Sequence, residues 1–338
     1  MFQQVSVGSV VQVEPPLRVT SAELARRLEP ARERLGVHPD VLLEEVAGIR
    51  ARRLWPPGTR VADAAALAGQ RALVTAGIPR DRVGLLVDTS VSRDHLEPSA
   101  ASVVHAALGL GEGCLNFDLS NACLGFLTGM DVAGRMIEHG AVEYALVVDA
   151  EVSGRIIDAT VERLNRPDAT VEGFREEFAS LTLGSAAAAM VLGRRGLLPD
   201  GPRFTGTVSL AATEFSHLCR GDLDRMVTDS AAVLEEGLRL ADRTYRRAVE
   251  AFGWDGAPPD EVAAHQVGRA HTDGLVERLG LDPTRVLRVY PERGNIGPAG
   301  LPVVLAELAR TGRLRRGSRV ALMGIGSGLN CSMADLVW

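Results

Sequence analysis

The chain of 338 residues contains no lysine, and all 37 of its basic residues are arginine. A Walker loop needs a lysine against the nucleotide phosphates, and pyridoxal or other Schiff-base catalysis needs an amine nucleophile. The absence of lysine therefore excludes both kinds of chemistry.

Long apolar runs and an excess of positive charge are missing as well. No stretch approaches the ~18 consecutive apolar residues of a membrane-spanning helix, and the first residues lack the basic and apolar segments of a secretory signal. The net charge of −6 makes the chain as a whole repel nucleic acid and anionic lipid. We therefore expect a cytoplasmic protein with no nucleic-acid partner and no integral membrane segment.

Cysteine is scarce, with residues at positions 114, 123, 219 and 331. They form no C-x-x-C pair and have no histidine at zinc-finger spacing, so free thiols and no metal site are predicted. Only Cys123 lies between a predicted strand and the first turn of a predicted helix. The amides of such a helix start favour thiolate over thiol and can hold the oxyanion of an acyl-transfer intermediate. By itself this position fits either a nucleophile or an inert core cysteine.

Strand-like and helical stretches alternate from about residue 20 to 193, and again after a Pro/Gly-rich linker at 197–202. This alternation predicts an α/β fold with mainly parallel sheets covered by helices. The two halves suggest an internal duplication, with one domain over 1–196 and a second over 197–338. The polar segment 158–180 is interpreted as an irregular surface excursion.

The predicted strands cover residues 83–87, 116–119, 144–149, 186–192, 204–210, 261–264 and 319–325. The predicted helices cover residues 99–109, 124–138, 230–252 and 298–310. Glycines at 109 and 140 are the expected stop signals of the first two helices.

Two residues in the second half could complete a site with the cysteine. His265 ends a short strand, where open α/β sheets bind their ligands, and Asn295 lies between glycines before a helix. Each is a weak indication alone, because a single histidine is commonly structural and asparagine beside glycine commonly marks a turn. His271, His95 and His105 compete for the same role.

Four segments together resemble the thiolase-superfamily condensing enzymes. They are Asn-Ala-Cys-Leu-Gly-Phe at 121, His265-Gln266, Gly-Asn-Ile-Gly at 294 and Gly-Ile-Gly-Ser-Gly-Leu at 324. The order and spacing of Cys123, His265 and Asn295 look like the triad of the ketoacyl-ACP synthase III branch. The resemblance runs from about Gly48 to the end. It implies two similar halves, each a mixed sheet covered by helices, packed as a five-layered α-β-α-β-α sandwich.

Glu97 stands before Pro98-Ser99-Ala100-Ala101, where ketoacyl-ACP synthase III enzymes typically have phenylalanine. This difference resembles the OleA-type enzymes, which join two long-chain fatty acyl-CoA molecules head to head into a 2-alkyl-3-ketoalkanoate. Their corresponding glutamate reaches across a homodimer interface. A malonyl donor forms its enolate by losing carbon dioxide, whereas a simple acyl-CoA must lose an α-proton to a base. The resemblance thus implies that Glu97 is this base.

The same resemblance implies the remaining site residues and partners. The amides of Cys123 and of the Gly326-Ser327 loop would hold the oxyanion, and Arg50 and Arg53 are candidates for contacts with the coenzyme A phosphates. Coenzyme A thioesters are expected as substrates, with no separate cofactor. The expected partners are long-chain acyl-CoA, a second copy of the chain and downstream enzymes of olefin biosynthesis.

Three other functions remain open from the sequence. The nearest is a ketoacyl-ACP synthase III-like condensation of an acyl group with a malonyl thioester. A thioester hydrolase or acyltransferase using the same cysteine is another. The third is a non-catalytic partner subunit, although such subunits commonly lack the nucleophile that this chain retains.

Overall fold

The computed structural model describes residues 1–338 and contains a nine-stranded mixed sheet in the order β11-β12-β13-β8-β1-β7-β6-β4-β5. The strands in the first half of the chain are β1 (Val5–Val13), β4 (Val83–Asp88), β5 (Leu115–Asp118), β6 (Tyr144–Glu151) and β7 (Ala186–Arg194). Those in the second half are β8 (Arg203–Ala211), β11 (Glu261–Ala264), β12 (Arg319–Gly326) and β13 (Asn330–Val337).

The nine strands form two blocks that repeat one topology. In the first block β1, β7 and β6 pair antiparallel, and β6, β4 and β5 pair parallel. In the second block β8, β13 and β12 pair antiparallel and β12 and β11 pair parallel, with a parallel bridge from Val262 to Val286 in the fifth place. The blocks meet through the single pair Ser6–Arg203 of β1 and β8. This repetition supports a division of the chain near residue 196, which stays a prediction.

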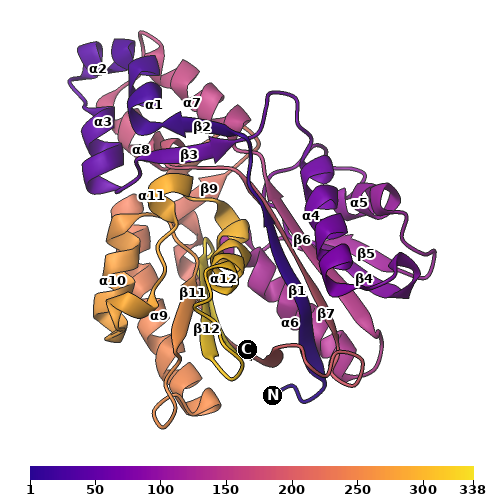
Figure 1. Ribbon diagram of the computed structural model, residues 1–338. Coiled ribbons are helices and arrows are strands. Elements are labelled where there is room, and N and C mark those ends of the chain that lie inside the picture. Colours follow the sequence, from indigo (N-terminus) through magenta and orange to yellow (C-terminus); the bar gives the residue numbers. More distant parts are fainter.

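Helices cover both faces of each block and complete five layers (Figure 1). The helices α6 (Gly125–Glu138) and α12 (Gly300–Arg310) pack between the two blocks and contact strands of both. On the outer faces lie α4 (Val61–Ala76) and α5 (Ala100–Leu108) over the first block, and α9 (Ser230–Phe252) and α10 (Arg269–Leu279) over the second. The predicted thiolase-like sandwich is therefore confirmed. The expectation of mainly parallel sheets was wrong, because antiparallel pairs outnumber parallel pairs in the nine-stranded sheet.

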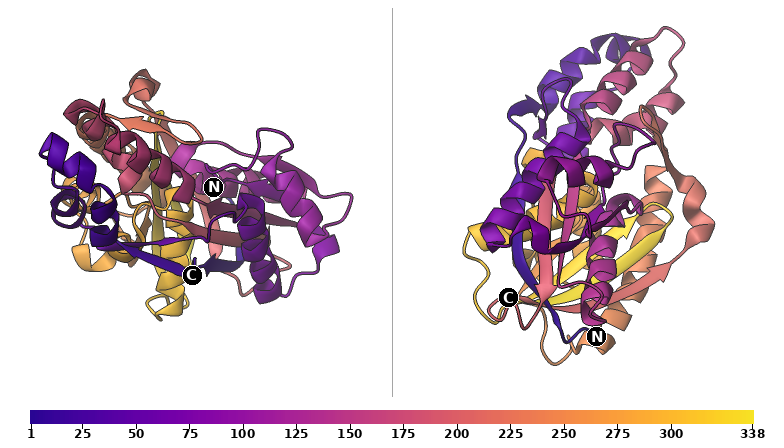
Figure 2. Two further views of the ribbon diagram at one scale, coloured as in Figure 1. Left: turned by 90° about the horizontal axis from the view of Figure 1, so that it is seen from above. Right: turned by 90° about the vertical axis from the view of Figure 1, so that its right-hand side faces the viewer.

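A cluster of small elements stands on one end of the layered body, away from the two termini (Figures 1 and 2). It comprises the hairpin β2 (Leu17–Thr20) and β3 (Ala51–Leu54) and the helices α1 (Ser21–Arg27), α2 (Glu29–Leu35), α3 (Pro39–Val41), α7 (Gly154–Asn165) and α8 (Val171–Leu181). We call its five helices the helical cap. The remaining short elements are β9 (Cys219–Gly221), β10 (Met226–Thr228) and α11 (Tyr290–Arg293).

The interpretation of residues 158–180 as an irregular surface excursion was wrong. This segment contributes to α7 and α8, whose buried apolar faces pack against Leu24 and Leu28 of the same cap. Ile157, Val161 and Leu164 recur at the spacing of one helix face, and the charges that dominate the composition lie on the other faces.

The strands β1 and β13, the first and last of the sheet in chain order, were not predicted. Gly and Ser interrupt the apolar pattern of β1, and β13 follows a Gly-rich turn directly. Cys331 accordingly lies within a strand and is buried, although the last predicted strand ends at residue 325. The strand β5 is the half-exposed edge of the sheet. No helix combines the length and apolar character that a membrane span requires.

We predict that Phe174→Ala lowers the free energy of unfolding by about 3–5 kcal/mol, because its ring fills the apolar center of the helical cap. Val74→Ala is the control, since the Val74 side chain on α4 is 76% exposed and its loss should cost less than about 0.5 kcal/mol. Urea titration followed by circular dichroism measures both changes. Equal and small effects would show that the cap packs more loosely than described.

Candidate active site

Cys123 lies in a tight turn between the edge strand β5 and the central helix α6. Residues Ala122–Leu124 form a 3₁₀ turn, and Ala122 has a φ of 46°, a left-handed conformation that a residue with a side chain rarely adopts. Two side-chain hydrogen bonds of Asn121 fix the start of the turn. Its Nδ2 donates to Thr128 Oγ1 at 3.0 Å, and its Oδ1 accepts from Asn330 Nδ2 at 3.2 Å. The predicted strand, turn and helix around Cys123 are therefore present.

The turn between β12 and β13 lies directly against the cysteine turn. At Gly326, a β-carbon would stand 3.0 Å from the Asn121 carbonyl oxygen and 3.2 Å from the Leu124 nitrogen. Only glycine allows so close a backbone approach. Ser327 follows in this turn, half-buried and with no side-chain hydrogen bond in the chain. The predicted oxyanion loop is thus next to the predicted nucleophile.

His265 follows β11 and faces the interior with an unpaired ring. Its backbone nitrogen donates to the Met323 carbonyl at 2.8 Å, which fixes the residue at the end of the strand. The residue is buried, and neither ring nitrogen has a hydrogen-bond partner in the chain. Burial, with the nearby His271, lowers the pKa of His265 to about 4, so the imidazole is neutral at pH 7. A neutral ring with both nitrogens free can donate one hydrogen bond and accept another.

Asn295 is held by its backbone and offers its side-chain amide. Its nitrogen donates to the Thr182 carbonyl at 2.9 Å, and its carbonyl accepts from the Gly184 nitrogen at 2.8 Å. The Oδ1 atom accepts from the Gly297 nitrogen at 3.1 Å. The amide nitrogen is thereby turned away from Gly297 and donates to no group of the chain.

The start of α12 connects these residues. Its first residue, Gly300, is close enough to His265 that a β-carbon there would lie 3.4 Å from Nδ1. The preceding 3₁₀ turn Gly297–Ala299 packs against the turn of Cys123. The structure therefore brings the cysteine, histidine and asparagine segments together at the junction of the two blocks, although they are distant in the sequence.

The thiol of Cys123 is less acidic than the sequence analysis predicted. The residue keeps some exposure, yet burial raises the pKa of Cys123 to about 12, with further contributions from Cys219, Glu151 and Asp149. The backbone amide of Cys123 lowers the pKa, as expected at a helix start, but the net shift is upward. Desolvation and nearby acidic groups outweigh the helix amides here.

A cluster of buried acids near the site was missed in the sequence. Burial raises the pKa of Asp88 to about 6, that of Glu151 to about 7 and that of Asp149 well above its usual range. None of the three forms an ion pair, and one oxygen each of Asp88 and Asp149 lacks a hydrogen-bond partner. The available signal was β6, an apolar strand that ends in two acids and is buried throughout. No group of three histidine, cysteine or acidic side chains is arranged to hold a metal ion.

Within one chain, Glu97 forms no hydrogen bond or ion pair with Cys123, His265 or Asn295. It lies on the exposed loop between β4 and α5, next to Leu96, whose surface is 81% exposed. Its carboxylate makes no hydrogen bond and no ion pair in the chain.

The two predicted coenzyme A ligands are paired with acids. Arg50 contacts Glu292 at 3.0 Å, and Arg53 contacts Glu14 at 2.8 Å. Arg52 between them is fully buried and donates to the Leu181 carbonyl and to Ser21 Oγ. The contacts with phosphate that were predicted for Arg50 and Arg53 stay predictions.

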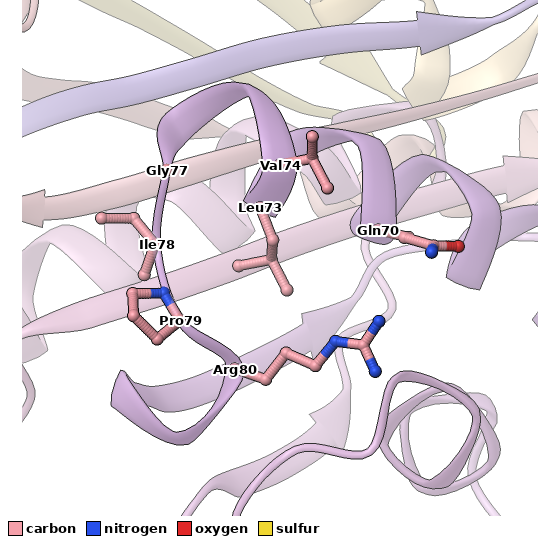
Figure 3. A pocket seen from close by; sticks show the side chains of 7 residues that line it. All are labelled: Gln70, Leu73, Val74, Gly77, Ile78, Pro79 and Arg80. Atoms are coloured by element: carbon pink, nitrogen blue, oxygen red, sulfur yellow. The ribbon is translucent and has the colours of Figure 1, made fainter.

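A surface hollow of about 360 Å³ lies elsewhere, along the outer face of α4 (Figure 3). Its lining comprises Gln70, Leu73, Val74, Gly77, Ile78, Pro79 and Arg80. These side chains include no nucleophile and no acid, so the hollow carries no chemistry of its own.

The fold and this grouping define a thiolase-fold condensing acyltransferase with a cysteine nucleophile. Family models of 3-oxoacyl-[acyl-carrier-protein] synthase III match residues 117–208, and residues 250–338 for the C-terminal part. The acyl-CoA:acyl-CoA alkyltransferase of Xanthomonas campestris pv. campestris is 50% identical over 338 residues, covering 100% of both chains. That of Shewanella oneidensis is 34% identical, covering 100% of this chain and 99% of the other.

Solved structures agree with these matches. The crystal structure of a Xanthomonas campestris OleA variant with bound lauric acid and lauroyl-CoA superimposes with a TM-score of 0.97 at 50% identity and covers 100% of both chains. The chain therefore belongs to the 3-oxoacyl-[acyl-carrier-protein] synthase III family, among the acyl-CoA:acyl-CoA alkyltransferases.

The substituted positions in the Xanthomonas campestris structures have the same spacing as three residues of this chain. Single replacements of a glutamate, a cysteine and a histidine were crystallised in the Xanthomonas campestris protein. There the cysteine follows the glutamate by 26 residues and the histidine follows the cysteine by 142. Glu97, Cys123 and His265 have the same separations.

We predict that alkylation of Cys123 in the free protein accelerates about tenfold per pH unit from pH 7 to 10, as the thiolate fraction of a thiol with a raised pKa does. Iodoacetamide labelling followed by peptide mass spectrometry measures the rate at this residue alone. The Cys123→Ala variant supplies the background of the other thiols. A rate that levels off below pH 8 contradicts the raised pKa.

Proposed function

We propose that the protein is a homodimer that condenses two long-chain fatty acyl-CoA molecules into a 2-alkyl-3-ketoalkanoate without decarboxylation. The observation that carries the proposal is the pair of unused donors, the His265 imidazole and the Asn295 amide nitrogen, beside the turn of Cys123. Two neutral donors in a buried site suit a thioester oxygen that becomes an enolate. The similarity to two acyl-CoA:acyl-CoA alkyltransferases supports this assignment.

The first step is the transfer of an acyl group to Cys123. Its sulfur attacks the thioester carbon, and the bond to coenzyme A sulfur breaks. The thiol proton passes to the leaving sulfur, so that free coenzyme A and a Cys123 thioester result. The backbone N–H groups of Cys123 and of the Ser327 turn hold the oxyanion of the intermediate.

The second step forms the enolate of a second acyl-CoA. Its carbonyl oxygen accepts hydrogen bonds from His265 and Asn295, while the partner's Glu97 removes the α-proton. The low pKa of His265 supports this role, because a neutral imidazole stabilises an enolate as a donor without protonating it. The exposed position of Glu97 in a single chain supports its service in the site of the other subunit.

The third step makes the carbon–carbon bond. The enolate carbon attacks the Cys123 thioester, and the sulfur leaves as a thiolate that is then protonated. Hydrolysis of the remaining coenzyme A thioester, with Glu97 activating the water, gives the free ketoacid. We place this reaction in the cytoplasm as the first step of long-chain olefin biosynthesis, with later enzymes of that process as partners.

Arg50 and Arg53 are proposed to contact the coenzyme A phosphates. Glu292 and Glu14 hold the two guanidinium groups at the protein surface. The Arg50–Glu292 pair is exposed and contributes little stability, so a phosphate with higher charge can replace this carboxylate, and it can compete with Glu14 for the half-buried Arg53.

We predict that the purified protein converts a single long-chain acyl-CoA into the condensed ketoacid or its ketone, detected by mass spectrometry. Cys123→Ala should abolish both acylation and product, whereas Glu97→Gln should leave Cys123 acylated without product. Product that appears only when a malonyl thioester is added would instead establish a decarboxylative condensation. Free fatty acid alone would indicate a hydrolase.

We predict that Asn295→Ala slows condensation by about 10²–10³-fold, the usual effect of removing one donor from an oxyanion site. Acylation of Cys123 should continue, because the amide serves the second substrate. Intact-protein mass spectrometry follows the acyl adduct while product is quantified in parallel. Equal loss of both steps would place Asn295 in the first reaction.

A further inference from the structure

Glu151 is a buried acid at the end of β6. Its carboxylate accepts hydrogen bonds from the loop that carries Glu97. Its Oε1 accepts from the Val91 nitrogen at 2.7 Å, and its Oε2 accepts from the Ser92 nitrogen at 3.2 Å and from Ser92 Oγ at 2.6 Å. The Ser92 hydroxyl in turn accepts from the Val152 nitrogen at 3.1 Å. One side chain thereby satisfies three donors of the loop.

The same loop is fastened again before and after its exposed tip. Asp94 accepts from the first two backbone nitrogens of α4, at 2.9 and 3.1 Å. Arg93 pairs with Asp118, which also accepts from the nitrogens of Ala100 and Ala101 at 3.0 and 2.8 Å. Only the four residues 95–98 project freely between these anchors, and they include Glu97.

The other side of Glu151 faces the catalytic loop of its own subunit. A β-carbon at Gly297 would lie 3.3 Å from Glu151 Cγ, so the stem of the acid packs against the backbone two residues after Asn295. Glu151 thus lies between the loop of Asn295 and the loop that carries Glu97.

We propose that Glu151 is a positioning residue for α-proton removal: it fixes the loop that presents Glu97 to the site of the partner subunit. This inference rests on the proposed function and adds a residue that touches no substrate. A base must lie within hydrogen-bond reach of the proton it removes, and an error of about 1 Å can cost ~10²-fold in rate. Glutamine cannot replace Glu151, because its amide NH₂ would face a backbone N–H.

We predict that Glu151→Gln slows condensation about 10²-fold while Cys123 is still acylated. Exchange of the α-protons of bound acyl-CoA with D₂O should fall by the same factor, because removal of that proton is the affected step. Glu138→Gln is the matched control, since Glu138 also accepts from two backbone nitrogens, those of Gln3 and Gln4, but just before β1. If Glu151→Gln does not fold, Ser92→Ala replaces it, because it keeps the acid and removes one of its hydrogen bonds. Condensation should then slow while acylation of Cys123 continues.

Heterodimers with two different affinity tags separate this role from a local one. With Cys123→Ala and Glu151→Gln on different subunits, the intact Cys123 is served by an intact loop, and about half of the wild-type condensation should remain because one of two sites works. With both substitutions on one subunit, the remaining Cys123 is served by the altered loop, and condensation should fall about 10²-fold. The reverse pattern overturns the inference and assigns Glu151 to its own site.

The corresponding pair with Glu97→Gln tests the proposed function separately. If Cys123→Ala and Glu97→Gln are active on different subunits and inactive on one, Glu97 acts across the interface. If that pair behaves as expected and the Glu151 pair does not, only the positioning role is wrong. If both pairs lack the pattern, the crossed role of Glu97 is wrong as well.

Discussion

Burial at the junction between the two sheet blocks determines the charge of the two groups most able to react there, His265 and Cys123. Burial lowers the pKa of His265 to about 4 and raises that of Cys123 to about 12, so both are neutral at pH 7. Neutral groups without hydrogen-bond partners are costly to bury and are retained where a ligand completes their bonding. The same low polarity strengthens any hydrogen bond to a charge that forms during a reaction.

The repeated topology explains how four distant segments reach one region. The loop of Glu97 follows β4 and His265 follows β11, the strands that hold equivalent places in the two blocks. Cys123 and Asn295 likewise precede α6 and α12, the two helices of the central layer. Each half therefore supplies one residue after a strand and one before a helix. Of the two residues that follow a strand, Glu97 of the first half is exposed and His265 of the second half is buried.

The parts of this arrangement that a sequence can predict are those encoded locally. The helix over 230–252 was predicted with its observed bounds, because Asp229 caps its start and Gly253 ends it in a left-handed conformation. The cysteine, histidine and asparagine segments were found because turns with glycine have short, recognisable patterns. The helical cap was not, since its charged outer faces hid an apolar spacing that becomes significant only when α1 and α7 meet. Neither the acidity of Cys123 nor the contacts of Glu151 could be predicted, because both depend on groups brought close by tertiary packing.

The position of Glu97 bears directly on the proposed condensation. A base must lie within hydrogen-bond reach of the proton that it removes, and no hydrogen bond or ion pair holds the exposed Glu97 side chain in the single chain. The other acids near Cys123 are Asp88, Asp149 and Glu151, and burial raises the pKa of all three. If a second subunit supplies the base, as proposed, the loop that carries Glu97 must be held in place by its own subunit. The three hydrogen bonds that end on Glu151 meet that requirement with an acid that remains inside its own fold.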